Sequence, residues 1–440
     1  MEKNNTAWIE HNILPLANKV QRNRYLQAIQ SGFMTCMPIM LLGSIVIILT
    51  RPWADYTTMM PTDAGYNFFK SWQLLIDKYG APLLLLRSMT LYSLSLWVVL
   101  ALSYHLALHY KMNTIITPIV VLLQFFVLCS TKTKDGGISN DFWGGEGLFA
   151  AILVAILVTE FYRLLTEKKI GEIKMPEMVP PALKNSFSAI FPIIITTAIC
   201  TVISLIFNYV IGIPFPKAIL TVFHPIIFVL DNAFGLAISS VLSQIVWWFG
   251  IHNTAITSML EPLMYSNLAS NSSAYAAGTA AGALPHIWTE SLWWNFMVIG
   301  GSGATLSVAI MLLFSKSKQM KTVGKIAIVP AIFNINEPII FGLPIVLNPL
   351  FFIPWVSAQT LNGVISYLCM KVGLVNRSFV YPGWNIPTPI GEFLSTMDYR
   401  AVILAVLLVA IDGLLYYPFL KVYERQKVKE ENVELIQSGS

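Results

Sequence analysis

The sequence predicts an all-α polytopic membrane protein, and three observations support this fold class. Of its 440 residues, 55% are hydrophobic and only 12% are charged, whereas soluble domains carry about twice that charged share. Apolar runs of about 20 residues, long enough to cross a bilayer core, recur along most of the chain. The short alternating segments typical of a membrane β-barrel are not evident.

The predicted helices begin with an amphipathic lead-in. Residues before 30 carry apolar side chains at helical spacing, and we expect this segment to lie along the inner membrane surface. No cleavable signal peptide is evident there. The candidate spans that follow are 30–50, 82–107, 113–130, 147–166, 187–212, 233–260, 292–314, 346–369 and 399–420. One more span is expected from the proline-rich stretches, which gives about ten transmembrane helices.

The positive charges predict the orientation of these spans. Lysine and arginine gather near the N-terminus and at 163–184, 316–325 and 421–429, so both termini are expected in the cytoplasm. Three apolar stretches separate the second and third of these basic segments, although an even number of crossings is required. We therefore predict that Ala281–Gly303, which contains Pro285 and several glycines, is a re-entrant hairpin.

A second interrupted segment, Val329–Pro349, is apolar but rich in proline, and it predicts a second re-entrant hairpin. Broken helices in membrane carriers expose backbone groups and often mark a binding site near the middle of the bilayer. The predicted division of the chain follows from these interruptions. Residues 1–215 form a scaffold half with the lead-in and about five spans, 216–424 form the half that holds both hairpins, and 425–440 are a polar tail.

Three ionisable residues fall inside the predicted membrane region: Glu337 in the second interrupted segment, His252 after Trp247, and Arg87 near the start of a span. A charge inside a membrane bundle is costly and therefore suggests a function. Structural explanations stay open. Glu337 could bridge amides freed by the next proline, His252 could hydrogen-bond between helices, and Arg87 could reach the outer interface.

Trp384 is the aromatic residue that most suggests a ligand. It lies in the Gly/Pro-rich stretch YPGWNIPTP, which cannot be a plain spanning helix. An apolar ring with nearby hydrogen-bonding groups suits a sugar, although a packing or interfacial role stays open. The phosphate loop of ATP-hydrolysing proteins is absent from the sequence. The four cysteines lack CxxC spacing, so no zinc site is expected. We also expect no cofactor and no nucleic-acid partner.

Motifs in the second half resemble enzyme IIC, the membrane permease of the bacterial phosphoenolpyruvate-dependent sugar phosphotransferase system, in its lactose/cellobiose/diacetylchitobiose branch. They are NINEPIIFGLPIVLNPLFFIP at 334–354, WWFGIHN at 247–253, ALPHIW at 283–288, IGGSGATL at 299–306, GKIAIVP at 324–330 and WNIPTP at 384–389. The first half agrees mainly in hydropathy and length. Asn253 and Asn385 stand where the family often has glycine and threonine, which leaves the sugar preference open.

The resemblance implies a ten-span homodimer of the bacterial inner membrane. Its first half would form the dimer contact, and its second half would move a β-linked disaccharide across the membrane as an elevator. A separate phosphorylated IIB protein would then phosphorylate the C6 hydroxyl, so the chain would be an enzyme only within that complex. Glu337 corresponds to the proposed base, assisted by His252. Sugar-binding roles are expected for Asn336, Gly301, Trp384, Trp247 and Arg87.

Two alternatives remain at this stage. A proton-coupled secondary sugar transporter would use Glu337 and His252 as proton carriers, without chemistry on the sugar. A channel-like or receptor scaffold would bind the sugar without turnover.

Overall fold

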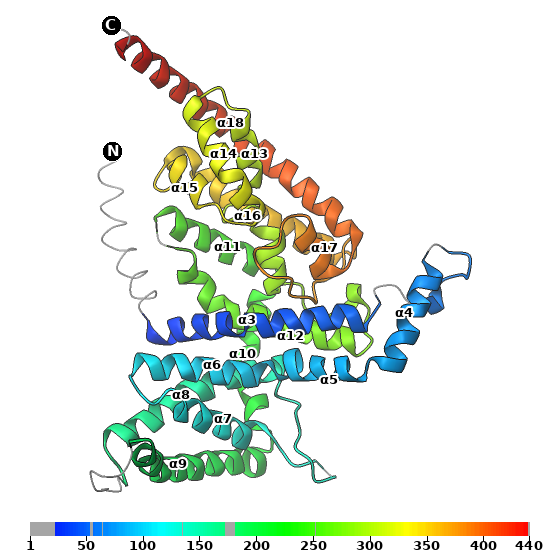
Figure 1. Cartoon of the computed structure of the whole chain (residues 1–440), viewed down its shortest axis with the longest axis vertical. Helices are drawn as coiled ribbons and strands as arrows, with labels where there is room; N and C mark the ends of the chain where they lie inside the picture. Colours follow the sequence, from blue (N-terminus) through cyan, green and yellow to red (C-terminus); the bar gives the residue numbers. More distant parts are fainter. Residues whose placement is uncertain are drawn as a thin grey trace. The chain divides into compact units, whose positions relative to one another are not determined.

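The structure, a computed structural model, describes residues 23–52, 56–63, 65–133, 135–171, 181–250 and 252–438 (Figure 1). The regular secondary structure of these residues is helical, with one isolated bridge between Lys132 and Ile138. The predicted all-α class is therefore confirmed. The predicted amphipathic lead-in falls mostly outside the described residues.

Four helical segments of the described residues are long and apolar enough to cross a membrane. They are Arg24–Thr50, Gly145–Glu167, Phe187–Ile211 and Tyr399–Val433. A fifth span is possible if α5 (Ala81–Thr90) and α6 (Leu94–His109), which are bent by 42°, cross as one. α7 (Ile116–Cys129) and α11 (Ala233–Trp248) are shorter apolar helices. The total of about ten spans stays a prediction.

The chain folds into two compact units. The N-terminal unit contains Gln21–Val46 and Leu75–Ile227, and the C-terminal unit contains Ile47–Leu74 and Phe228–Ser440. The boundaries between the units fall within helices, including α3 (Arg24–Thr50).

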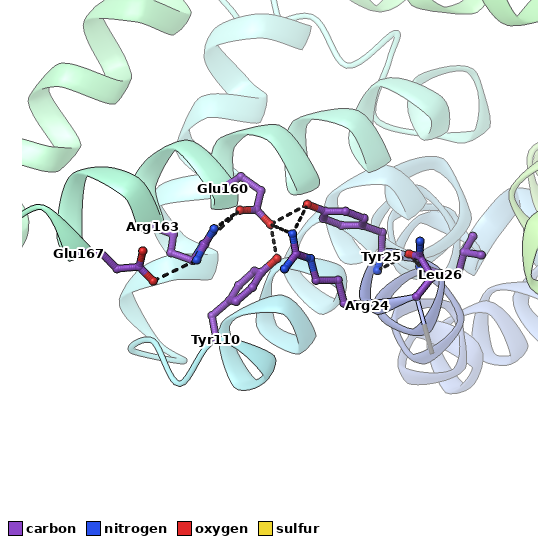
Figure 2. A network of polar contacts seen from close by, with 8 residues as sticks. Arg24, Tyr25, Leu26, Tyr110, Glu160, Arg163 and Glu167 are labelled. Carbon is purple, nitrogen blue, oxygen red and sulfur yellow. Dashed lines mark hydrogen bonds and ion pairs between the residues drawn. The ribbon is translucent and has the colours of Figure 1, made fainter. Parts of the chain in front are cut away.

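Within the N-terminal unit, α6 packs on α7 and on α8 (Leu148–Glu167), and α9 (Pro181–Leu205) covers α7 and α8. A polar network ties α3 to these helices (Figure 2). The carboxylate of Glu160 on α8 accepts hydrogen bonds from Tyr25 at 2.9 Å, from Arg163 at 2.9 Å and from Tyr110. Because these donors satisfy the carboxylate, an ionised side chain can stay partly buried between apolar helices.

Within the C-terminal unit, α16 (Pro349–Lys371) is the central helix. It packs on α11 and on α18 (Tyr399–Ser438), and α13 (Leu306–Leu313) and α14 (Lys318–Ile332) also contact α18. Buried amides join the central helix to its neighbours, with Gln244 donating to Gln359 at 2.7 Å and Asn362 donating to Asp412 at 2.9 Å. Hydrogen bonds of this kind hold helices together where apolar surface alone gives no preference for a partner.

Besides the span predicted at 82–107, which consists of α5 and α6, two further predicted spans are not continuous helices. The span predicted at 233–260 is broken, because α11 ends at Trp248 and the next helix, α12 (Thr254–Ala276), begins only at Thr254. Gly250 lies in this break with a φ of +82°, a conformation that glycine adopts without strain. The span predicted at 292–314 consists of a π-helix at Leu292–Met297, a glycine turn and α13.

The predicted polar tail continues the last helix, because α18 runs through residue 438. Glu431 in this extension accepts hydrogen bonds from the backbone N–H groups of Lys318 at 3.1 Å and Gln319 at 2.9 Å. It also accepts one from the Ser317 hydroxyl at 2.7 Å. These contacts satisfy the unpaired amides at the start of α14, so the extension packs against α14 within the C-terminal unit.

Candidate functional site

Glu337 is the first residue of the short helix α15 (Glu337–Gly342), which Pro338 starts at its first turn. α14 ends at Ile332, and the turn between the two helices contains Asn334 in a left-handed conformation with a φ of +61°. Although Glu337 falls inside the predicted membrane region, its side chain is exposed. Hydropathy measures the apolar segment as a whole, whereas this turn directs one polar side chain outward.

His252 lies in the turn between α11 and α12 rather than inside a continuous helix, and its side chain is also exposed. The imidazole meets the edge of Trp247, with ring centroids 4.2 Å apart and planes at 82°. The turn that carries His252 and the turn that carries Glu337 are both hydrogen-bonded to Ser302, the first through Asn253 and the second through Asn336.

Asn336 holds the Glu337 turn against the glycine turn at 299–305. It is buried, and its Nδ2 donates to the Ser302 carbonyl oxygen at 2.6 Å and to Thr305 Oγ1 at 2.8 Å. Gly301, with a φ of +101°, packs on the same carboxamide, where an added methyl group would lie 2.3 Å from Asn336 Cγ. A glycine is therefore required at this position both by the conformation and by the contact.

Sequence reasoning did not identify Asn334 as a site residue. Its Oδ1 accepts from the Gly300 N–H at 2.8 Å, and its Nδ2 donates to the Trp384 carbonyl oxygen at 2.9 Å. One buried side chain thus joins the glycine turn, the Glu337 turn and the Trp384 loop. The available sequence signal is an asparagine in an apolar run, a residue type that adopts left-handed turns more readily than others.

Asn253 adds a fourth segment to this arrangement. Its Nδ2 donates to Ser302 Oγ at 2.9 Å, which ties the His252 turn to the glycine turn. The exposed side chains of Glu337 and His252 therefore belong to turns that the buried residues Asn336 and Asn253 hydrogen-bond to the glycine turn.

Trp384 is half-buried, and its ring centroid lies 6.5 Å from that of Trp294 with planes at 57°. Arg87 belongs to the N-terminal unit, where its guanidinium lies over Tyr92 at 5.4 Å. The remaining predicted site residues all belong to the C-terminal unit. Within the described parts of the chain, no group of three His, Cys, Asp or Glu side chains is arranged to hold a metal ion.

The exposed polar side chains of these turns can hydrogen-bond to a polar solute. A carboxylate, an imidazole and indole rings lie on a bundle with membrane-spanning helices, and the helices break where these groups are displayed. This combination defines the class of helical membrane transport proteins.

The chain belongs to the phosphotransferase system EIIC family. The family model matches residues 30–358. The family expected from the sequence motifs is thereby confirmed.

Curated relatives agree with this assignment. The chain is 33% identical to the "PTS system lactose-specific EIICB component" of Staphylococcus epidermidis, covering 97% of this chain and 72% of the relative. It is 33% identical to the "PTS system cellobiose-specific EIIC component" of Geobacillus stearothermophilus, and the match covers 98% of this chain and 97% of the relative. It is 31% identical to the "Lichenan permease IIC component" of Bacillus subtilis, and the match covers 98% of this chain and 96% of the relative.

A solved structure is similar over nearly the whole chain. The crystal structure of ChbC, the IIC component from the N,N'-diacetylchitobiose-specific phosphotransferase system, superposes with a TM-score of 0.86. The two chains are 31% identical, and the match covers 97% of this chain and 99% of ChbC.

Proposed function

We propose that this permease binds a β-linked disaccharide of the cellobiose, diacetylchitobiose or lactose class and presents its C6 hydroxyl for phosphorylation by a phosphorylated IIB protein. The named substrates of the relatives support this sugar class. The name of the lactose relative joins a C and a B component, which supports a IIB protein as the partner.

The observation that carries the proposal is that Glu337 and His252 are both exposed and belong to turns that buried asparagines hydrogen-bond to Ser302. Phosphoryl transfer depends mainly on positioning the acceptor hydroxyl and on accepting its proton as the new bond forms. The Glu337 carboxylate would accept the C6 hydroxyl proton, and the imidazole of His252 would hydrogen-bond to the same hydroxyl. The exposure of both side chains supports access for a sugar and for an incoming phosphoryl group.

The turns around this pair would supply the sugar contacts. Trp384 would pack on the apolar face of a sugar ring, and Trp247 would provide a second ring beside the imidazole. Gly301 would contact the sugar through its backbone. Because both N–H groups of the Asn336 carboxamide are engaged by Ser302 and Thr305, Asn336 would contact the sugar through its carbonyl oxygen. A sugar contact by Arg87 stays a prediction.

Transport would follow the elevator motion that the family resemblance implies. Residues 1–215 would form the scaffold and homodimer contact, 216–424 would move the sugar, and 425–440 would face the cytoplasm together with the N-terminus. The hairpins would be 281–303 and 329–349. The helix breaks before α13 and between α14 and α15 support this assignment. The membrane would be the bacterial inner membrane.

Reconstituted vesicles with purified phospho-IIB test the proposal against proton-coupled transport. Cellobiose, diacetylchitobiose and lactose are offered separately, and the vesicle contents are analysed for free and phosphorylated sugar. The proposal predicts phosphorylated sugar that depends on phospho-IIB and not on an imposed pH gradient. Accumulation of free sugar driven by the gradient would instead establish the proton-coupled alternative.

A further inference from the structure

The C-terminal unit contains a cavity that none of the proposed sugar-site residues lines. Its volume is about 530 Å³, within the range of small-molecule sites. Arg51, which follows the last residue of α3, and the turn Tyr56–Thr58 contribute to one part of the wall. The turn Ala281–Ala283 and Asn376 contribute to another part.

The guanidinium of Arg51 lies over an aromatic ring of this wall. Its central carbon lies 3.8 Å from the centroid of the Tyr275 ring. Tyr275 in turn stacks on Phe379, with centroids 3.8 Å apart and planes at 20°, and both rings are buried. Stacking fixes the plane of a guanidinium and leaves the N–H groups at its edge available to a ligand.

One nitrogen of this guanidinium has no hydrogen-bond partner among the described residues. Arg51 Nη1 is buried and makes no hydrogen bond to any described residue. An unsatisfied donor on a charged group is expensive, so a site that keeps one is expected to receive an acceptor from a ligand. The described lining residues include no aspartate or glutamate, and Arg51 is the only charged side chain among them.

The carboxylate of Asp398, which follows the lining residue Met397 in sequence, is already paired. Asp398 accepts from the Asn376 backbone N–H at 2.9 Å, and Arg400 donates to it from Nη2 at 2.8 Å and from Nε at 2.9 Å. The charge of Asp398 is therefore matched by Arg400.

We propose that this cavity binds an oxyanion, specifically the phosphate of a phosphate ester, through the guanidinium of Arg51. A planar guanidinium pairs with phosphate oxygens in a bidentate manner, and the polar groups of Asn376 and Thr396 lie in the same wall. Two sources share this chemistry. A lipid headgroup fits because Arg51 directly follows a membrane-spanning helix, and a soluble phosphate monoester fits the volume of the cavity.

Two binding assays on the full-length protein separate these sources. The first measures the affinity for glycerol 3-phosphate in neutral detergent by calorimetry. The second counts phosphatidylglycerol molecules retained from mixed phosphatidylglycerol and phosphatidylcholine nanodiscs by native mass spectrometry. Arg51→Gln is compared with the parent and with Lys371→Gln, which removes an exposed charge that does not line the cavity.

Arg51→Gln is expected to lower the affinity for glycerol 3-phosphate, or the number of phosphatidylglycerol molecules retained, by about tenfold or more, because a charge-assisted contact is lost. Loss in the first assay identifies a soluble phosphate, and loss in the second alone identifies a lipid. Arg51→Lys keeps the charge without the planar fork and should fall between parent and glutamine. Equal binding by the parent, Arg51→Lys and Lys371→Gln, with no measurable effect of Arg51→Gln in either assay, overturns the proposal.

The outcome is independent of the proposed sugar site. Cellobiose affinity is measured on the same preparations and should be unchanged in Arg51→Gln. If Arg51→Gln does not fold, Arg51→Lys carries the test, and parent-like binding of both probes by that variant rejects bidentate recognition.

Discussion

The side-chain nitrogen Nδ2 of Asn336 lies 2.6 Å from the backbone carbonyl oxygen of Ser302 and donates a hydrogen bond to it. This bond joins the residue before Glu337 to the glycine turn, which Asn253 in turn connects to the His252 turn. The turns of Glu337 and His252 are therefore both hydrogen-bonded to Ser302 through buried asparagines. The position of the proposed base should depend on these asparagines.

Asn334→Ala should weaken cellobiose binding by about 1–2 kcal/mol and lower the thermal stability, because two hydrogen bonds between turns are lost. Calorimetry and a thermal melt on the same preparation measure the two effects. Asn334→Gly is the matched variant, since it removes the same side chain but tolerates the φ of +61°. If the glycine variant binds sugar like the parent, Asn334 does not position the site.

Gly301→Ala should destabilise the protein by about 2–4 kcal/mol, because the added methyl group overlaps Asn336 and the residue must keep a positive φ. Gly278→Ala is a close control, since Gly278 has a φ of +111° and no atom within 4 Å of an added methyl group. A thermal melt should show the larger loss at Gly301. Equal losses at both positions would mean that backbone strain alone matters there.

Trp384→Ala should weaken disaccharide binding by roughly 1–3 kcal/mol if the indole packs on a sugar ring, by analogy with other aromatic stacking. Trp384→Phe keeps a flat ring and should retain most of the affinity. Because the Trp384 carbonyl oxygen rather than its ring bonds to Asn334, neither change removes that hydrogen bond. Unchanged affinity in the alanine variant would assign Trp384 to packing.

Glu431→Ala should lower the stability by about 1–2 kcal/mol, since it leaves the backbone amides at the start of α14 without their acceptor. Glu430→Ala is the control, because that neighbouring side chain is exposed and pairs with Lys427 at 2.6 Å. Thermal melts of the two variants should differ clearly. A parent-like melt for Glu431→Ala would show that the extension of α18 does not stabilise α14.

Hydropathy predicted the helical class and the positions of most helices, because long apolar runs have few alternatives in a membrane. It did not predict the break between α11 and α12. Trp247, Trp248 and Phe249 are as apolar as the helix before them, so the average hydropathy hardly changes where the chain turns. Gly250 was the local signal for that turn.

The extension of α18 shows what composition left open. Its polar residues predicted a polar tail at 425–440 but not its helical structure, although lysine and glutamate favour helices and pairs such as Lys427 with Glu430 stabilise one turn. The role of Asn334 lay beyond sequence reasoning for a different reason. Its partners Gly300 and Trp384 are 34 and 50 positions away, and only tertiary structure brings them together.

The central claim is that Glu337 accepts the sugar's C6 proton while a phosphoryl group arrives from IIB. Glu337→Gln keeps a hydrogen-bonding amide, so cellobiose affinity should stay within about threefold of the parent. Initial rates of cellobiose phosphorylation by purified phospho-IIB should fall by about 100-fold or more, because the amide cannot accept the proton. A mutant that phosphorylates cellobiose as fast as the parent would contradict the assignment of Glu337 as the base.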